Sequence, residues 1–236
     1  MAVVTGGARR LGRHLGLMLV RRGYHLVCLY RTSTDEVRTL AAEVAAMGGT
    51  MRALSVDVAD REAVASTFAD LEAHEGRVDV LINNVGNYHP QPVQDLDPLQ
   101  WDATIGANLS GAFYTSWHAL KLMPDGGQIV NIGMAGLEGT RASRLAADYF
   151  VSKTGLLSLT RSMAQAYGSR GIRVNMVSPG QLENSIDLPD PARLAREIPL
   201  GRAGTLEDMA DAVEWLLEAS YVTGVNLDVA GGYRLG

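Results

Sequence analysis

Seven short apolar runs alternate with longer amphipathic stretches along the whole chain, and this alternation restricts the folds that the chain can adopt. The runs lack the regular polar–apolar alternation of a half-exposed strand, which indicates strands buried on both faces. Such strands, joined by right-handed helical connections, form a parallel sheet with helices on both sides. The sequence therefore predicts one doubly wound α/β domain over residues 1–236, with strands in residues 2–5, 25–30, 51–56, 78–83, 128–133, 172–178 and 225–230.

Charge and hydrophobicity exclude several classes of function. The net charge of −5 leaves no basic excess for a nucleic-acid phosphate backbone, so no nucleic-acid partner is expected. No apolar run approaches the roughly 18 residues of a membrane span, and no membrane partner is expected either. The single cysteine, Cys28, lies in an apolar run and has no partner for an internal disulfide, which favours a cytoplasmic location.

The stretch TGGARRLG (5–12) follows the first predicted strand and opens the first helix. A helix N-terminus in this position can bind a pyrophosphate, and Gly6 and Gly12 allow the tight turn and the close backbone approach. A tight turn without a ligand is the alternative. Arg10 is unexpected, because this kind of turn usually carries glycine there.

The end of the second predicted strand bears on the cofactor. A site for a free ribose 2′-hydroxyl places Asp or Glu there, whereas Arg31, Thr32 and Ser33 suit a 2′-phosphate. The expected cofactor is therefore NADPH, unless Arg31 is only a solvated loop residue. After the third strand, Asp57 is either a partner for an adenine amino group or a helix cap. The fourth strand ends in NNVG (83–86).

Tyr149 and Lys153 stand four residues apart in DYFVSK, on one face of a predicted helix. Only two of the 21 basic residues are lysine, which makes a lysine at this spacing notable. A tyrosine with a pKa near 10 is a poor acid at neutral pH, and a nearby ammonium lowers that pKa. Lysine can also pass on a proton, which arginine cannot. The pair therefore predicts acid–base chemistry.

Together these motifs resemble the short-chain dehydrogenase/reductase family, as do ANLSG, RVNMVSPG (173–180) and YVTGVNLDVAGG (221–232). The resemblance implies a Rossmann-type fold, hydride transfer with a nicotinamide cofactor, and a homotetramer. It assigns Tyr149 as proton donor, Lys153 to the nicotinamide ribose and Asn108 to a water in the proton relay, and it assigns no metal. The implied cofactor-binding residues are Gly6, Arg10, Leu11, Gly12, Tyr30, Arg31, Thr32, Ser33, Asp57, Val58, Asn83, Gly86, Tyr149, Lys153, Pro179 and Gly180.

One element of the family pattern is missing. After the fifth strand the pattern has a serine that polarises a substrate carbonyl, but the sequence reads NIGMAG and puts Met134 at that place. Thr140 and Ser143 are candidate substitutes. The departure weakens the expectation of ordinary ketone reduction.

Within the family, the arginine in the first turn resembles that of pteridine and dihydromonapterin reductases. Tyr88 matches the aromatic that in this group stacks a pterin against the nicotinamide, although it is alternatively a rim residue without a stacking role. The resemblance implies a substrate site of Arg10, Tyr88, Met134 and Tyr149, and a pterin-like small molecule as substrate. Reduction of a ring C=N also depends less on a carbonyl-polarising hydroxyl.

Two other functions stay open. A 3-oxoacyl thioester or generic ketone reductase is favoured by RVNMVSPG and YVTG, and an NADPH-binding sensor by the missing serine. The Tyr149 and Lys153 pair argues against the sensor. Residues 181–201 contain no clear strand or helix, and a loop of this length is typical of a substrate lid. By family analogy, Arg234 in the C-terminal tail lies near a neighbouring subunit's site.

Overall fold

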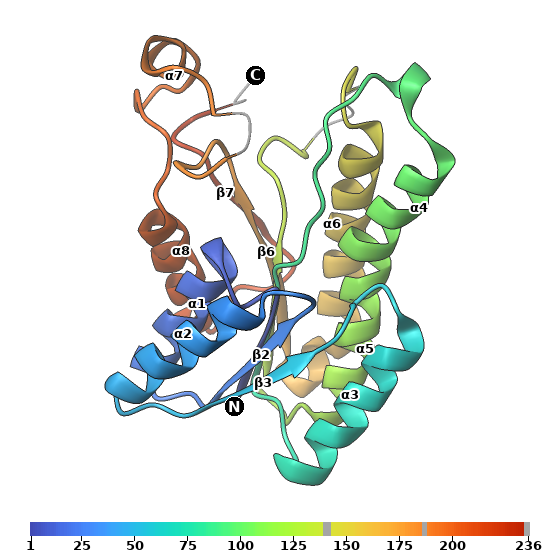
Figure 1. Cartoon of the computed structure of the whole chain (residues 1–236), viewed down its shortest axis with the longest axis vertical. Coiled ribbons are helices and arrows are strands. Elements are labelled where there is room, and N and C mark those ends of the chain that lie inside the picture. Colours follow the sequence, from blue (N-terminus) through green and yellow to red (C-terminus); the bar gives the residue numbers. More distant parts are fainter. Residues whose placement is uncertain (139–142, 186–187, 234–236) are drawn as a thin grey trace.

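The computed structural model describes residues 1–138, 143–185 and 188–233, and these contain a seven-stranded parallel sheet (Figure 1). The order β3-β2-β1-β4-β5-β6-β7 reverses direction between β1 and β4, as in a doubly wound fold. The fold-class prediction is confirmed. The strands are β1 (Ala2–Thr5), β2 (Leu26–Tyr30), β3 (Met51–Ser55), β4 (Val80–Asn83), β5 (Gln128–Ile132), β6 (Arg173–Pro179) and β7 (Asn226–Val229).

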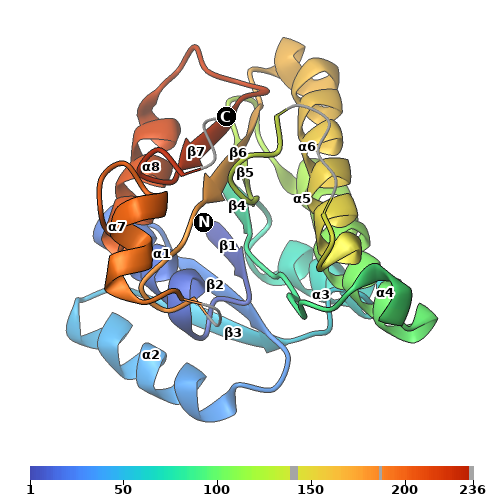
Figure 2. The same ribbon diagram turned by 90° about the horizontal axis from the view of Figure 1, so that it is seen from above.

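Helices cover both faces of the sheet, with α1, α2 and α8 on one side and α3, α4, α5 and α6 on the other (Figures 1 and 2). Among the described residues, no helix is long and apolar enough to span a bilayer. The helices are α1 (Arg10–Arg21), α2 (Thr34–Ala46), α3 (Arg61–His74), α4 (Pro98–Ile105), α5 (Gly111–Leu122), α6 (Ala147–Tyr167), α7 (Pro191–Glu197) and α8 (Leu206–Glu218), with the short turns η1 (Val93–Asp95), η2 (Gly106–Ser110) and η3 (Gly168–Arg170).

The strands are buried on both faces because successive side chains enter different cores. Val4 and Ile82 belong to the cluster beneath α1 and α8, whereas Val3 and Leu81 belong to the cluster that contains α3 and α5 residues. All four are fully buried. Two-sided burial explains why the strand sequences are continuous apolar runs.

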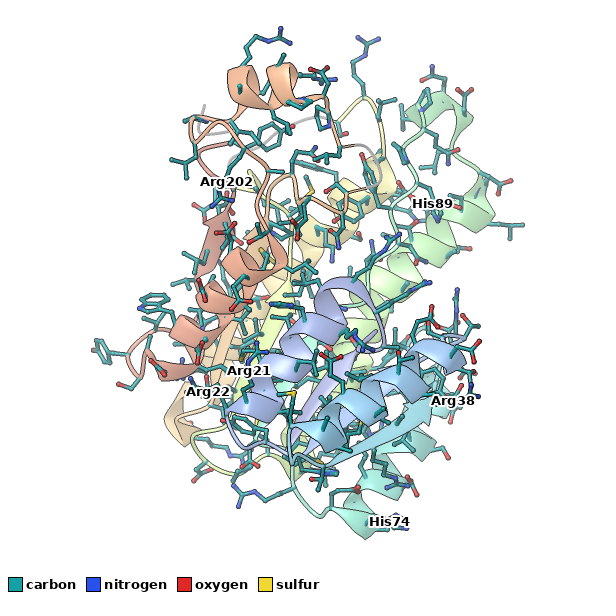
Figure 3. All side chains as sticks on the ribbon, turned by 60° about the vertical axis from the view of Figure 1, so that its left-hand side comes forward. Arg21, Arg22, Arg38, His74, His89 and Arg202 are labelled. Carbon is teal, nitrogen blue, oxygen red and sulfur yellow. The ribbon has the colours of Figure 1, made fainter. Side chains whose placement is uncertain are left out.

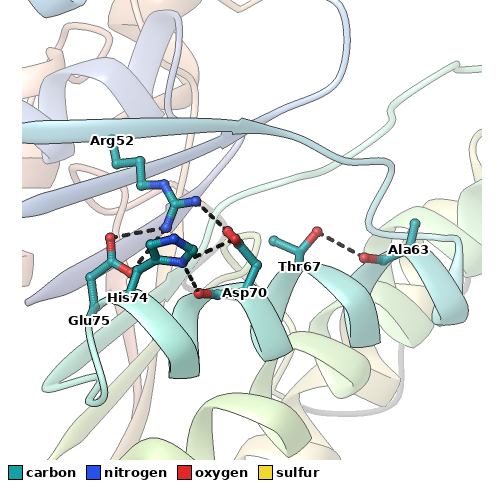
Figure 4. A network of polar contacts seen from close by, with 6 residues as sticks. All are labelled: Arg52, Ala63, Thr67, Asp70, His74 and Glu75. Carbon is teal, nitrogen blue, oxygen red and sulfur yellow. Dashed lines mark hydrogen bonds and ion pairs between the residues drawn. The ribbon is translucent and has the colours of Figure 1, made fainter.

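Surface ion pairs join elements at the periphery. Arg52 on the edge strand β3 contacts Asp70 at 2.5 Å and Glu75 at 3.2 Å, so the pair of carboxylates fastens α3 to that edge (Figure 4). On the opposite side, Arg22 after α1 bonds Glu218 of α8 at 2.9 Å, and its place beside α8 is visible in Figure 3. These peripheral contacts lie away from the carboxyl ends of the strands.

The seven-residue helix α7 corrects the expectation that residues 181–201 carry no regular structure. Asp190 caps this helix by accepting hydrogen bonds from the amides of Ala192 and Arg193. Pro191 occupies its first position, where a missing amide costs nothing. At two turns the helix is too short to produce a recognisable period in the sequence.

The helices differ in how their N-termini are satisfied. Side chains cap α3, α4, α7 and α8, and the capping residues are Asp60, Asp97, Asp190 and Thr205. No side chain caps α1, α2 or α6, whose N-cap residues are Arg9, Ser33 and Ala146. The helices α1, α2 and α6 begin at the same end of the sheet, and no side chain occupies their N-termini.

Candidate active site

A cavity of about 1030 Å³ lies at the carboxyl ends of the strands, beside the point where the strand order reverses. The residues preceding α1, α2 and α6, namely Arg9, Ser33 and Ala146, all line it. Helix N-termini carry partial positive charge, so an anionic ligand in this cavity is stabilised from three directions. A volume of this size accommodates a dinucleotide with a small substrate.

The first turn contributes Gly6, Arg10, Leu11 and Gly12 to the lining of the cavity. Gly6 has a φ of 62°. A Cβ on Gly12 would lie 2.2 Å from the Gly6 carbonyl oxygen and 2.5 Å from Nδ2 of Asn84. Hydrogen in place of a side chain is therefore required for α1 to approach the turn this closely.

Arg10 adopts a φ of 50°, in the left-handed region that favours glycine. A residue other than glycine costs on the order of 1–2 kcal/mol there, and Arg10 makes no ion pair with the described residues. This backbone geometry explains why glycine is usual at the position. A strained arginine facing a cavity is typical of a residue retained for its side chain.

The end of β2 lines the cavity through Tyr30, Arg31, Thr32 and Ser33. Arg31 Nη1 lies 3.2 Å from Asp57 Oδ2, and both side chains are substantially exposed. The Arg31 guanidinium is therefore accessible to a phosphate in the cavity.

Beyond β3 and β4 the cavity is lined by Asp57, Val58 and Gly86. Asp57 does not cap α3, because Asp60 does, and its Oδ1 instead accepts a hydrogen bond from the Ala59 amide. A Cβ on Gly86 would lie 3.4 Å from Nζ of Lys153. Gly86 therefore leaves the space in front of that ammonium open.

Asn83 does not line the cavity, contrary to its expected cofactor role. Its Nδ2 donates to Ser116 and Asn131, and its Oδ1 accepts from Thr115, so the buried amide is fully used inside the fold. The next residue, Asn84, lines the cavity and holds the first turn by donating to the carbonyls of Thr5 and Gly6.

Tyr149 and Lys153 both line the cavity from the first turns of α6. Lys153 is 2% exposed and donates from Nζ to the Ile132 carbonyl at 2.7 Å, and Nζ lies 5.7 Å from the Tyr149 ring centre. Burial lowers the pKa of Lys153 from 10.5 to about 8. A lysine so placed can gain or lose a proton near neutral pH.

The depressed pKa of Lys153 predicts that the free energy of unfolding depends on pH. Between pH 8 and 10.5 the unfolded chain holds a proton that the folded chain has lost, so stability rises with pH across this window. At about 1.4 kcal/mol per pH unit, the stability of wild type relative to Lys153→Met increases by roughly 3 kcal/mol, measured by urea unfolding. The exposed Lys121 provides the control, and Lys121→Met keeps the wild-type pH dependence. A stability difference between wild type and Lys153→Met that does not change with pH would contradict the prediction.

Asn108 lies behind the cavity wall and does not line it. It belongs to η2, a π-helical turn, and its side chain is completely buried. Its Oδ1 accepts from the Asn87 amide, and its Nδ2 donates to the Asn87 carbonyl and to Ser152 Oγ. These side-chain bonds fix the backbone next to Tyr88 and α6, so a relay water would have to use other atoms of Asn108.

The expected substrate residues Tyr88 and Met134 line the cavity with Tyr149. The rings of Tyr88 and Tyr149 meet edge to face, with centres 4.9 Å apart. Ser143 also lines the cavity and donates its hydroxyl to the Leu145 carbonyl. Thr140, the other candidate for the missing serine, lies outside the described residues.

Pro179 and Gly180 complete the wall at the end of β6. The Gly180 amide donates to the Val229 carbonyl at 3.0 Å, and a Cβ on Gly180 would lie 2.9 Å from Ala230. The glycine therefore permits close contact with the chain after β7. Arg234, expected near a neighbouring subunit, lies outside the described residues.

Sequence reasoning missed four charged residues that line the cavity, namely Arg9, Arg144, Arg193 and Glu197. Arg193 Nε bonds Glu197 at 2.8 Å along α7. The Asp190–Pro191 pair is a helix-start signal that would have predicted α7 and therefore the 193/197 pairing. Arg144 follows residues outside the described ranges, and no motif marks it.

The chain is similar to known proteins over nearly its whole length. A family model described as "Enoyl-(Acyl carrier protein) reductase" matches residues 6–234. A human 3-oxoacyl-[acyl-carrier-protein] reductase is 35% identical over 240 residues, covering 100% of this chain and 98% of that protein.

Solved structures agree in fold. A short-chain dehydrogenase/reductase from Serratia marcescens has a TM-score of 0.92 at 31% identity, with 99% of this chain and 97% of that chain covered. A blue fluorescent protein from a metagenomic library, in complex with NADPH, also has a TM-score of 0.92 at 31% identity, with 100% and 97% covered. From the family-model match, the full-length relatives and the shared fold, it follows that the chain belongs to the short-chain dehydrogenase/reductase family.

Proposed function

We propose that this chain is an NADPH-dependent reductase acting on a small molecule. The observation that carries the proposal is the buried Lys153 one turn after Tyr149, at the wall of a cavity that three helix N-termini face. Arg31, Thr32 and Ser33 offer a cation and two hydroxyls to a ribose 2′-phosphate. A structural neighbour in complex with NADPH supports the same cofactor.

In this proposal the reduced nicotinamide supplies a hydride when bound, and the protein supplies the proton. Tyr149 donates its phenolic proton to the heteroatom of the substrate double bond. The Lys153 ammonium stabilises the resulting phenolate, and its lowered pKa lets it return a proton. Gly6, Leu11, Gly12, Asp57, Val58, Gly86, Pro179 and Gly180 form the remaining cofactor walls.

Gly12→Ala tests the cofactor site without changing charge. Because the new Cβ would lie 2.2 Å from a backbone oxygen, the turn must open, and we expect the dissociation constant of NADPH to rise at least tenfold. Gly16→Ala on the same helix is the matched control, since its Cβ meets the flexible end of Leu26 at 3.1 Å. Its NADPH affinity stays within twofold of wild type in fluorescence titrations. Equal affinities for the two variants would contradict the proposed binding turn.

We propose a flat, conjugated ring C=N, as in a dihydropterin, as the substrate. Tyr88 supports this choice, because its aromatic ring contacts Tyr149 at the cavity wall and can cover a planar ligand. Met134 supports it too, since an apolar thioether replaces the hydroxyl that a ketone would use. Arg10 lies where it can contact both phosphate and an electron-rich ring.

A 3-oxoacyl thioester is the second candidate. Relatives from Homo sapiens and Staphylococcus aureus carry this activity in their names. Arg144 and Arg193 add positive charge to the cavity lining, where a phosphate-bearing acyl carrier would approach. The test follows NADPH absorbance with dihydropterins, acetoacetyl thioesters and simple ketones in parallel. Faster turnover of the thioester without pterin reduction would replace the first candidate by the second. NADPH binding without any turnover would support the sensor function.

Substitutions of Tyr88 test whether its aromatic ring stacks on a pterin substrate. Tyr88→Ala removes a stacking surface worth on the order of 0.5–1.5 kcal/mol beyond burial, so the KM for a dihydropterin rises about tenfold. Tyr88→Phe keeps the ring and is expected to remain within twofold. Steady-state kinetics on both variants provide the measurement. A loss of the same size in Tyr88→Phe would assign the effect to the hydroxyl instead.

Two further expectations stand as proposals. We propose that residues 181–201, including α7, form the substrate loop, because Gln181, Asn184 and Arg193 line the cavity. We also propose a homotetramer, supported by the exposed Phe113 and Trp117, one turn apart on α5. The molecular mass in solution, from light scattering, tests the second proposal.

A further inference from the structure

Two buried hydrogen bonds hold the helix that carries Tyr149 against the segment formed by α4 and η2. Thr104 Oγ1 donates to Asp148 Oδ2 at 2.6 Å, and Asn108 Nδ2 donates to Ser152 Oγ at 3.1 Å. Thr104 and Asn108 are four residues apart, as are Asp148 and Ser152. The two hydrogen bonds therefore cross-link the two segments at successive helical turns. Asp148 and Ser152 immediately precede Tyr149 and Lys153, which places one cross-link at each of these residues.

In the hydrogen bond between Thr104 and Asp148, the Thr104 hydroxyl is the donor. Gln100 Nε2 donates to Thr104 Oγ1 at 3.1 Å, so the single proton of the Thr104 hydroxyl is free to point at Asp148. Thr104 is fully buried and Asp148 is 1% exposed. The other carboxyl oxygen, Asp148 Oδ1, has no hydrogen-bond partner among the described residues. The carboxyl therefore depends on Thr104 for its orientation.

The first turn of α6 follows a strained backbone entry. Its N-cap residue, Ala146, has a φ of 56° and gives no side-chain cap, so the chain enters the helix through a strained conformation. The Ala146 amide donates to the Gln91 carbonyl, in the segment that follows Tyr88. A buried carboxyl without full hydrogen bonding is an expensive group to keep for stability alone.

We infer that Asp148 is a positioning residue: its bond to Thr104 sets the place of the first turn of α6, and thereby the place of the Tyr149 hydroxyl in the cavity. The inference rests on the proposed role of Tyr149 as proton donor. Misplacement of a reacting group by about 1 Å can reduce a rate about a hundredfold. Loss of this single bond is therefore expected to lower kcat more than it lowers cofactor affinity.

The test separates positioning from stability. Thr104→Val is nearly isosteric but removes the donor, and kcat falls at least tenfold while the dissociation constant of NADPH stays within twofold. Thr104→Ser restores the hydroxyl, and its kcat returns to within threefold of wild type. In Thr104→Val/Asp148→Leu both polar partners are gone, so the melting temperature recovers relative to Thr104→Val. Its kcat nevertheless stays low.

Thr160→Val is the matched control on the same helix. Thr160 is also fully buried, and its hydroxyl accepts from Asn131 Nδ2 at 2.9 Å, three turns away from Tyr149. This variant loses stability but keeps the wild-type kcat. Recovery of kcat together with the melting temperature in the double variant would overturn the inference, as would an equal loss of kcat in Thr160→Val.

Failure of the proposed function gives a different result, because wild type itself would then reduce no compound of the panel. For that case, crystal structures of wild type and the double variant decide the inference without a substrate. We expect the Tyr149 ring to shift relative to Lys153 Nζ in the double variant. An unchanged ring position would overturn the inference.

Discussion

Replacing Tyr149 by phenylalanine is expected to lower kcat by about a thousandfold, while the dissociation constant of NADPH changes less than twofold. The phenol is the proposed proton donor, and positioned acid catalysis contributes roughly 10²–10⁴ in rate. The phenylalanine ring keeps the edge-to-face contact with Tyr88, so the cavity wall stays in place. Stopped-flow absorbance and cofactor fluorescence measure the two quantities.

Tyr167→Phe is the control for this experiment. Tyr167 is the last residue of α6 and does not line the cavity. Removal of its hydroxyl is therefore expected to leave kcat unchanged. Near wild-type turnover in Tyr149→Phe would remove the acid–base assignment of this helix. It would also require another proton source from among the residues that line the cavity.

Arg31→Asp is expected to reduce kcat/KM with NADPH about a hundredfold and to leave activity with NADH little changed or improved. A charge-assisted hydrogen bond is worth roughly 1.5–3 kcal/mol, and the new carboxylate adds repulsion towards a 2′-phosphate. The ion pair of Arg31 with Asp57 is exposed, so breaking it costs little stability. The effect therefore reports on the cofactor.

Arg38→Asp provides the matched charge change. Arg38 lies on α2 (Figure 3), is 77% exposed and pairs with Asp35. It does not line the cavity. The ratio of NADPH to NADH activity in this variant stays at the wild-type value. A wild-type protein that uses NADH as well as NADPH would show that the end of β2 has been misinterpreted.

Much of the fold follows from the sequence because each strand is buried on both faces. A run such as residues 80–82 must be apolar because its side chains are buried on both faces of the sheet, so this pattern is visible in the sequence alone. The helix α7 did not follow, because its seven residues bury only Leu194 and so leave no periodic pattern. Short elements are defined by their caps more than by their apolar face.

Within the site, the sequence identified a residue's role where the chemistry requires one particular residue type. Lys153 is recognisable because the chain uses arginine for nearly every other positive charge. Asn83 and Asn84 are not distinguishable in this way, since both are amides at a strand end. Only packing shows that the first enters the buried network of Thr115, Ser116 and Asn131 while the second faces the cavity.

The sequence by itself determined the parallel sheet, the glycine turn, the basic end of β2 and the Tyr149–Lys153 pair, because each depends on residues that are close along the chain. The tertiary structure decided the strain at Arg10, the lowered pKa of Lys153 and the cross-link between Thr104 and Asp148. Burial and hydrogen bonding between distant segments depend on how the layers pack, and local patterns carry no record of that packing.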